Sequence, residues 1–195
     1  MLAQSLAFSR IAVDNGEIWR LATASLAHLS WAHLAGNLLV FAAAAVLLRR
    51  TATPAAVAAV LAACALVSTL GIYLGTTLDW YVGASGGLYG LLAWGASRLP
   101  MPTGLWLLGL LTLNVAMDQG RTLSWLGEPL APQGHYWGLA CGLALAIMSG
   151  WRTSAATPRA ACVEAPAAGS PEASCGGWAG RPGAVSMRAA RISAT

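Results

Sequence analysis

A serine, two histidines and an asparagine stand in long stretches of the chain that carry no charged residue: Ser85, His33, His135 and Asn37. The Ser85 hydroxyl is a weak nucleophile by itself and needs a base within hydrogen-bond reach, a role that the imidazole of His135 would fill. Attack on a carbonyl also needs N–H donors for the developing oxyanion, which the His33 ring, the Asn37 amide and the Ser85 backbone amide would supply. These groups predict serine-type hydrolysis of a peptide bond.

Each of these residues has a simpler interpretation when it is taken alone. His33 and Asn37, four residues apart and so on one helix face, would link neighbouring helices by hydrogen bonds. The glycines around Ser85 are typical of close helix packing. His135 would be an ordinary histidine at a membrane interface. The catalytic interpretation therefore depends on whether the fold brings these residues to one depth.

The composition indicates a membrane protein rather than a water-soluble one. Hydrophobic residues make up 57% of the 195 residues and charged residues 9%, against about 25% charged in soluble domains, and the mean hydropathy is +0.62. Apolar runs of this length cross a hydrocarbon core of about 30 Å as helices, because lipid offers the backbone no hydrogen-bond partners. We expect an all-α, polytopic membrane helical bundle with spans at about 31–48, 55–76, 83–98, 102–118 and 134–151.

The arginines predict the orientation of these spans. Only arginine follows the first, third and fifth spans, which places those ends in the cytoplasm by the positive-inside rule. These residues are Arg49, Arg50, Arg98, Arg152 and Arg159. The helix starts that carry His33, Ser85 and His135 then lie at the outer side of the membrane. Since three different helices supply these residues at one depth, chance is a poor explanation for them.

The start of the chain is expected to lie outside the lipid. Met1–Phe8 is too short to span a membrane, so we expect the first helix of the bundle to be largely missing, through a misplaced start codon or a lost helix. The hydrophilic stretch Ser9–Arg20 would lie on the outer side. Arg10 and Arg20 would be an exception to the positive-inside rule there, but the charge of the stretch is balanced by Asp14 and Glu17.

The end of the chain differs in composition from the rest. Residues 152–195 are rich in Ala, Gly, Pro and Arg and hold few large apolar groups, so they would form a disordered cytoplasmic tail. The expected organisation is a membrane domain over residues 1–151 followed by this tail. The sequence has no phosphate loop, dinucleotide fingerprint or metal-ligand cluster, so we expect no cofactor and no nucleic-acid partner.

In this order and spacing the residues resemble the rhomboid intramembrane serine proteases. The matching motifs are His33-x-x-x-Asn37, Gly83-x-Ser85-Gly86 and a distant His135 followed by small residues. They would fall on the second, fourth and sixth helices of the six-helix rhomboid core. The resemblance covers about residues 16–150.

The resemblance implies a role for each residue. Ser85 would be the nucleophile and His135 the general base, while His33 and Asn37 would form the oxyanion hole with the Ser85 amide. Tyr89 would hold the imidazole edge-on and limit its rotation, in place of a third triad member. Glycines would let the two helices approach closely enough for the serine and the histidine to bond. These supporting glycines are Gly83, Gly86, Gly90, Gly138 and Gly142.

Within this family, three stretches look like the rhombosortase branch: Gly16–Thr23, Trp80–Gly86 and Met117–Gly120. That resemblance implies exported substrates with a C-terminal Gly-Gly motif, an apolar helix and a basic end. Two alternatives stay open, a general rhomboid protease of single-pass proteins and a non-catalytic rhomboid-like protein that binds membrane clients. A channel or transporter would need a charged group inside a span, and the charge-free runs supply none.

The prediction from the sequence is therefore an intramembrane serine endopeptidase. It would lie in the bacterial inner membrane as a multi-pass protein and cut a membrane-anchored segment near the periplasmic face. Its partners would be the lipid bilayer and a membrane protein substrate.

Overall fold

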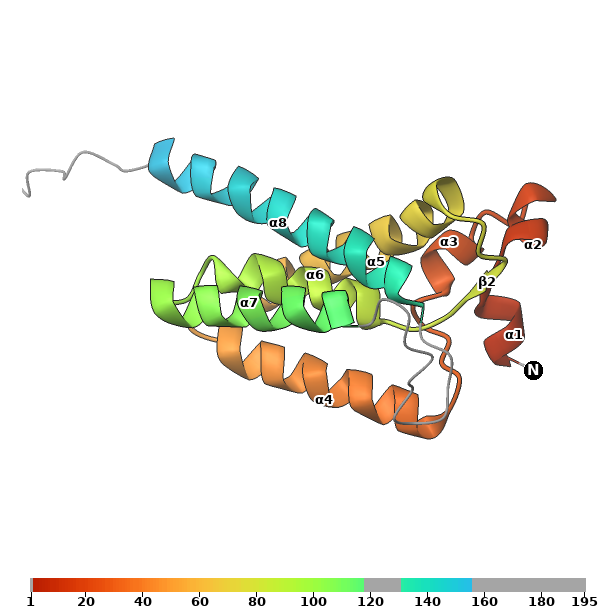
Figure 1. The fold of residues 1–195 in the computed structure, drawn as a ribbon, viewed down its shortest axis with the longest axis horizontal. Coiled ribbons are helices and arrows are strands. Elements are labelled where there is room, and N and C mark those ends of the chain that lie inside the picture. The colour runs from red at the N-terminus through yellow and green to blue at the C-terminus, as the bar shows by residue number, and fades with distance from the viewer. Residues whose placement is uncertain (1, 118–130, 156–195) are drawn as a thin grey trace, which may run out of the picture. The chain divides into compact units, whose positions relative to one another are not determined.

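The computed structural model describes residues 2–117 and 131–155, and these residues are mostly helical (Figure 1). The described helices longer than ten residues are α4 (Trp31–Leu48), α5 (Pro54–Gly75), α6 (Ser85–Ala96), α7 (Met101–Met117) and α8 (Pro132–Ala155). Helix α8 continues beyond the predicted span, which ended at 151. Adding residues to the end of an existing helix costs far less than starting a new one, so the helix extends into the first residues of the predicted tail. The remainder of the predicted disordered tail lies outside the described residues.

Side-chain caps and a proline mark where the first two long helices begin. The Ser30 hydroxyl accepts a hydrogen bond from the His33 backbone N–H at 3.2 Å, at the start of α4. The Thr53 hydroxyl accepts one from the Ala56 N–H at 3.2 Å, and Pro54 is the first residue of α5. The ends of α4, α5 and α7 fall within one residue of the ranges predicted from hydropathy.

Helix α6 lies at the centre of the described bundle. Most of its 12 residues are buried, and it packs most extensively against α8 and α5. At about 1.5 Å per residue α6 is about 18 Å long, shorter than a hydrocarbon core and shorter than the predicted range 83–98. A helix enclosed by other helices need not reach either membrane surface. Its start is set by Gly83, whose φ of 113° breaks the helical path just before Ser85.

Glycines allow α6 and α8 to pack backbone against backbone. A Cβ atom at Gly138 would collide with the carbonyl oxygen of Gly86, and a Cβ atom at Gly142 would collide with that of Gly90. Apolar side chains gain nothing from meeting each other instead of lipid, so such close contacts are what hold membrane helices together. The crossing brings the first turns of α6 and α8 side by side.

The residues before α4 form short elements beside the end of α5. They are α1 (Leu2–Leu6), β1 (Phe8–Ser9), α2 (Arg10–Asp14) and α3 (Arg20–Thr23), and β1 pairs antiparallel with β2 (Trp80–Tyr81), the strand that leads into α6. The Arg10 guanidinium donates hydrogen bonds to the carbonyl oxygens of Tyr73 at 2.8 Å and Thr76 at 2.7 Å. A cation at the C-terminal end of a helix is favoured by the helix dipole.

The charged residues of this segment contact one another and the end of α5. Arg20 contacts Glu17 at 2.6 Å. Asp14 accepts a hydrogen bond from a tyrosine hydroxyl on α5 at 2.8 Å, and Arg10 lies 3.9 Å from Asp79. The end of α5 offers Arg10 several carbonyl oxygens without helical partners, and together they bind the guanidinium better than one exposed carboxylate does.

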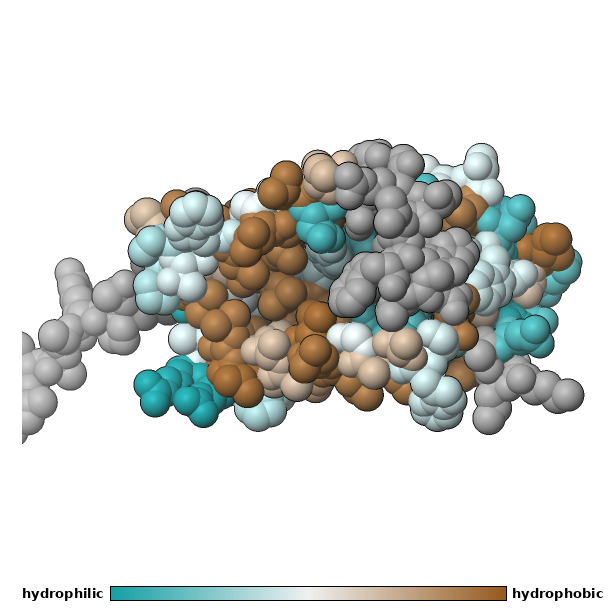
Figure 2. Space-filling view, turned by 60° about the horizontal axis from the view of Figure 1, so that its bottom comes forward, coloured by the Kyte–Doolittle hydropathy of each residue, from teal (hydrophilic) through white to brown (hydrophobic). Residues whose placement is uncertain are grey.

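The described helices have the surface of a membrane protein. Helices α4 and α5 are long and apolar enough to cross a membrane, by length and composition. On the face drawn in Figure 2, apolar side chains gather between more polar ones toward the two ends. Leu39 is 72% exposed and Leu74 is 73% exposed, which is costly in water over so wide an apolar area but not in lipid. That the first helix of a larger core is missing stays a prediction.

Candidate active site

Ser85 is positioned by the turn between β2 and α6. Because Ser85 is the first residue of α6, its backbone N–H has no partner within the helix. Gly83 makes the turn that precedes it. A Cβ atom at Gly83 would lie 2.8 Å from Cε1 of His33, so the left-handed turn also packs tightly against α4.

The His135 imidazole reaches Ser85 from the first turn of α8. His135 Nε2 lies 3.0 Å from Ser85 Oγ, although the two residues are 50 positions apart in the chain. His135 is only 5% exposed, whereas Ser85 is half-buried. In this arrangement the hydroxyl can pass its proton to the imidazole as its oxygen attacks a carbonyl.

The Tyr89 ring lies flat against the imidazole of His135. The two ring centroids are 4.3 Å apart and the ring planes differ by 17°, so the predicted edge-on contact is wrong and the rings are stacked. Tyr89 lies one helical turn after Ser85 on the same face of α6. An imidazole that enters from α8 and reaches the serine must therefore lie along the tyrosine ring, with Nε2 directed at the hydroxyl.

Asn114 of α7 holds the other end of this tyrosine. The Tyr89 hydroxyl donates a hydrogen bond to Asn114 Oδ1. Asn114 was not predicted from the sequence, although an amide within an apolar run is the same signal that singled out Asn37. The contacts thus run from α7 through Tyr89 and His135 to Ser85.

His33 and Asn37 lie on α4, next to the turn at Gly83. A Cβ atom at Gly83 would lie 3.0 Å from His33 Nε2 and 3.9 Å from Asn37 Nδ2. The His28 ring packs edge-on against His33, with centroids 5.1 Å apart. The Asn37 amide nitrogen is buried and has no hydrogen-bond partner among the described residues. A buried N–H without a partner is costly, and here it lies beside a cavity that Ser85 also lines.

Two cavities meet at Ser85. The first has a volume of about 290 Å³ and lies between α4, α6 and α7, with Asn37 and Asn114 among mostly leucine walls. The second has a volume of about 220 Å³, and its lining includes His33, His135 and the strand that precedes α6. The serine can therefore be approached from the side of the helices and from the side of the loops.

Ser68 and Tyr81 add buried hydroxyls next to the pair. The Ser68 hydroxyl donates a hydrogen bond to the Gly134 carbonyl and leaves no room for a side chain at Gly86. The Tyr81 hydroxyl donates one to the Gly83 carbonyl at 3.3 Å, and burial raises the pKa of Tyr81, which keeps this hydroxyl neutral. Neither residue was predicted from the sequence as part of the site. A serine inside an apolar helix usually bonds to its own helix, so Ser68 gave no signal.

The described helices are apolar and hold a hydroxyl and an imidazole in hydrogen-bond contact. This is the arrangement of a membrane protein with a nucleophile and a base for acyl transfer. A family model for the Rhomboid domain matches residues 15–152, most of the chain. The chain belongs to the rhomboid family, whose members are generally serine-type intramembrane proteases that act on membrane protein substrates. No individual curated protein matches it. The predicted family is thus confirmed, while the rhombosortase branch stays a prediction.

Proposed function

We propose that this protein is an intramembrane serine endopeptidase, with Ser85 as nucleophile and His135 as general base. The observation that carries the proposal is the 3.0 Å separation between His135 Nε2 and Ser85 Oγ. The family supports it, since rhomboids are generally serine proteases. The alternative of a client-binding protein without activity would have no need for this contact.

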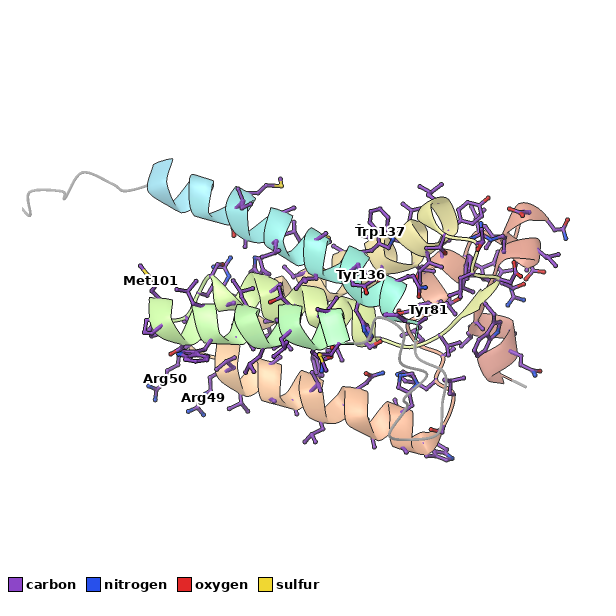
Figure 3. The ribbon with its side chains drawn as sticks, viewed as in Figure 1. Arg49, Arg50, Tyr81, Met101, Tyr136 and Trp137 are labelled. Carbon is purple, nitrogen blue, oxygen red and sulfur yellow. The ribbon has the colours of Figure 1, made fainter. Side chains whose placement is uncertain are left out.

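We also propose that the protein is a multi-pass protein of the bacterial inner membrane and that its active site faces the periplasm. Arg49 and Arg50 lie at the opposite end of the described bundle from Tyr81, which neighbours Ser85 in the sequence (Figure 3). By the positive-inside rule, the end with Arg49 and Arg50 belongs in the cytoplasm. Cleavage would then occur near the outer face of the membrane.

In the first half of the proposed reaction, Ser85 Oγ attacks the carbonyl carbon of the scissile peptide bond while its proton moves to His135 Nε2. The carbonyl oxygen becomes negative and accepts hydrogen bonds from Asn37, His33 and the Ser85 backbone amide. The C–N bond then breaks as His135 gives the proton to the leaving nitrogen. The amine fragment departs, and the acyl fragment stays on Ser85 as an ester.

In the second half, water releases the acyl fragment. His135 removes a proton from the water as its oxygen attacks the ester, and the same donors stabilise the second tetrahedral intermediate. The ester C–O bond breaks, the Ser85 oxygen regains its proton from His135, and a carboxylic acid leaves. The Tyr89 ring stacked on the imidazole keeps His135 aligned through both halves, which is the task of the third residue in a triad.

The two cavities at Ser85 suit the two reactants. The leucine-lined cavity between α4, α6 and α7 is suited to a segment that arrives from the lipid. The cavity under the loops is bordered by two histidines and gives water a path to the ester. The substrate segment must unwind before it is cut, because the carbonyls of an intact helix are engaged in its own hydrogen bonds.

We propose a narrower substrate class from the rhombosortase-like stretches. These substrates would be exported proteins that end in a Gly-Gly motif, an apolar helix and a basic end. Small residues suit a site enclosed between helices, since they let an extended segment approach Ser85 closely. A general protease of single-pass proteins is the competing assignment.

Labelling with a fluorophosphonate probe tests the nucleophile. We expect the purified full chain in detergent to be labelled, Ser85→Ala to be unlabelled, and His135→Ala to be labelled far more slowly. Ser97→Ala is the matched control, because Ser97 lies at the other end of α6 and should label as the wild type does. Equal labelling of the wild type and Ser85→Ala would remove Ser85 from this role.

Co-expression with two substrates tests the substrate class. One carries a Gly-Gly motif, an apolar helix and a basic C-terminal end, and the other is a single-pass protein without the Gly-Gly motif. Cleavage of the first alone, lost in Ser85→Ala, supports the narrower proposal. Cleavage of both supports a general rhomboid protease. Binding of either without cleavage, unchanged in Ser85→Ala, would support the client-binding alternative instead.

A further inference from the structure

A cavity larger than the two at Ser85 lies at the opposite end of the bundle. It has a volume of about 590 Å³ and opens between Val60 of α5, Trp94 of α6, and Leu145 and Met148 of α8, with Arg98 at its edge. Figure 1 shows α8 running away from α6 and α7 toward this end. The cavity follows from that divergence, because helices that meet backbone to backbone at one end and cross at an angle separate at the other.

This groove, defined by Val60, Trp94, Arg98, Leu145 and Met148, is apolar and open to the outside of the bundle. Met148 is 63% exposed and lies on the outer wall. A volume of 590 Å³ is in the range of about 300 to 1,000 Å³ that holds small-molecule ligands. In a membrane protein the molecules that reach such a groove are lipids.

Arg98 supplies a positive charge to the groove. Its guanidinium carbon lies 3.9 Å from the centre of the Trp94 ring, so the side chain is folded over the groove wall. The Arg98 Nε atom is buried and has no hydrogen-bond partner among the described residues. A buried guanidinium nitrogen without an acceptor is costly, which favours an acceptor from beyond the described residues.

Within the described ranges 2–117 and 131–155, no carboxylate is placed to serve as that acceptor. The carboxylates there are Asp14, Glu17 and Asp79, and each contacts a partner at the site end of the bundle. Arg98 follows the end of α6, which packs against the end of α4 through Gly95 and Leu48. Arg98 thus shares its end of the bundle with Arg49 and Arg50, so the local charge is positive.

We propose that the groove binds one anionic phospholipid, with its phosphate on Arg98 and an acyl chain along Val60, Leu145 and Met148. The charge complements the guanidinium, and the planar donors of arginine suit phosphate oxygens. The acyl chain covers apolar walls that α8 leaves uncovered where it diverges. Basic pockets between membrane helices are where anionic lipid headgroups are recognised.

The test measures lipid binding by native mass spectrometry on the delipidated full chain in neutral detergent. The probes are dioleoyl phosphatidylglycerol and dioleoyl phosphatidylcholine, which differ in headgroup charge and share their acyl chains. We expect the anionic lipid to bind the wild type at least about fivefold more tightly. Arg98→Gln should abolish this preference, and the matched control Arg49→Gln, which changes a cation at the same end outside the groove, should keep it.

A second variant tests the acyl part of the groove without touching the charge. Met148→Trp should fill the groove and weaken the binding of both lipids, while the chain stays folded because Met148 lies on the surface. Equal losses in Arg98→Gln and Arg49→Gln would overturn the proposal in favour of diffuse charge attraction. Full competition by inorganic phosphate at matched concentration would overturn it as well, since a free anion would then suffice. Neither result bears on Ser85, so failure here leaves the proposed protease activity untouched.

Discussion

The two ends of α6 are packed against α8 in opposite ways. At the first turn of α6 the backbones touch at Gly86 and Gly138, with no room for a methyl group. At its last turn, Trp94 and Leu145 line a cavity of about 590 Å³ instead. The contact is therefore closest where the hydroxyl and the imidazole meet, and loosest where no chemistry is proposed.

The cations at the two ends differ in the same way. At the site end, Arg10 donates to carbonyls of α5 and Arg20 contacts Glu17 at 2.6 Å, so protein groups hold both. At the other end, Arg98 has a buried nitrogen without an acceptor among the described residues. In the proposed orientation Arg10 and Arg20 would lie on the outer side against the positive-inside rule, and both are held there by protein groups.

Among the substitutions that compare the two ends of the bundle, Asn37→Ala at the site end is expected to have the largest effect, a loss of kcat. If the Asn37 amide donates to the oxyanion, its loss should lower kcat by about a hundredfold to a thousandfold with little change in KM. Ser97→Ala removes a polar group at the other end of α6, whose hydroxyl donates to the Trp94 carbonyl at 2.8 Å, and should leave kcat unchanged. Steady-state cleavage of a membrane-anchored reporter measures both. An Asn37→Ala enzyme of undiminished kcat would show that the amide has no part in the chemistry.

The next effect concerns stability and compares two glycines of the same helix. Gly138→Ala puts a methyl group into the Gly86 carbonyl and should destabilise the fold by about 1 to 3 kcal/mol. Gly150→Ala, at the open end of α8, meets no atom within 4 Å. It should be neutral or stabilise by up to about 1 kcal/mol through helix propensity. Unfolding in mixed micelles measures both, and equal changes would mean that the crossing is not tight at its start.

A smaller effect compares arginines at the two ends. Arg10→Gln removes charge-assisted hydrogen bonds to the end of α5 and should cost about 1 to 2 kcal/mol of unfolding free energy. Arg50→Gln changes an exposed residue and should cost close to nothing. The same micelle unfolding assay applies. If Arg50→Gln were the more damaging change, the pairing of Arg10 with α5 would contribute little to stability.

The sequence was enough to predict the long helices and which of their ends meet. Charge-free runs gave the ends of α4 and α5 to within one residue, because desolvation of the backbone and of charges dominates in lipid. Arginine placement grouped His33, Ser85 and His135 at one end. The composition does not predict that α6 is shorter than its apolar run. A helix that is enclosed by other helices need not match the thickness of the membrane.

Contacts between helices were the part that could not be predicted. The sequence does not indicate the carbonyls that bind Arg10, because only the position of the α5 end reveals them. The ring of Tyr89 was expected edge-on and is stacked, because its angle depends on the direction from which α8 arrives. Such angles follow from backbone crossings, which hydropathy does not encode.

The smallest effect concerns Asn114, which contacts no reacting atom and is a positioning residue. Asn114→Leu removes the acceptor of the Tyr89 hydroxyl, so the ring stacked on His135 should lose its fixed angle. We expect kcat to fall about fivefold, equivalent to about 1 kcal/mol, with KM nearly unchanged. A merely structural role would lower the unfolding free energy without this separation of kcat from KM.

Tyr89→Phe provides the matched partner for Asn114→Leu, since it keeps the ring and deletes only the hydroxyl. If the two residues act through one hydrogen bond, either change should have the same effect, and the double variant should be no slower than either single one. Additive losses would mean that Asn114 acts on the substrate cavity that it lines with Ser85 rather than on the imidazole. His135 would then be positioned only by the close packing of α6 against α8 at their glycines, and α7 would line the site without positioning the imidazole.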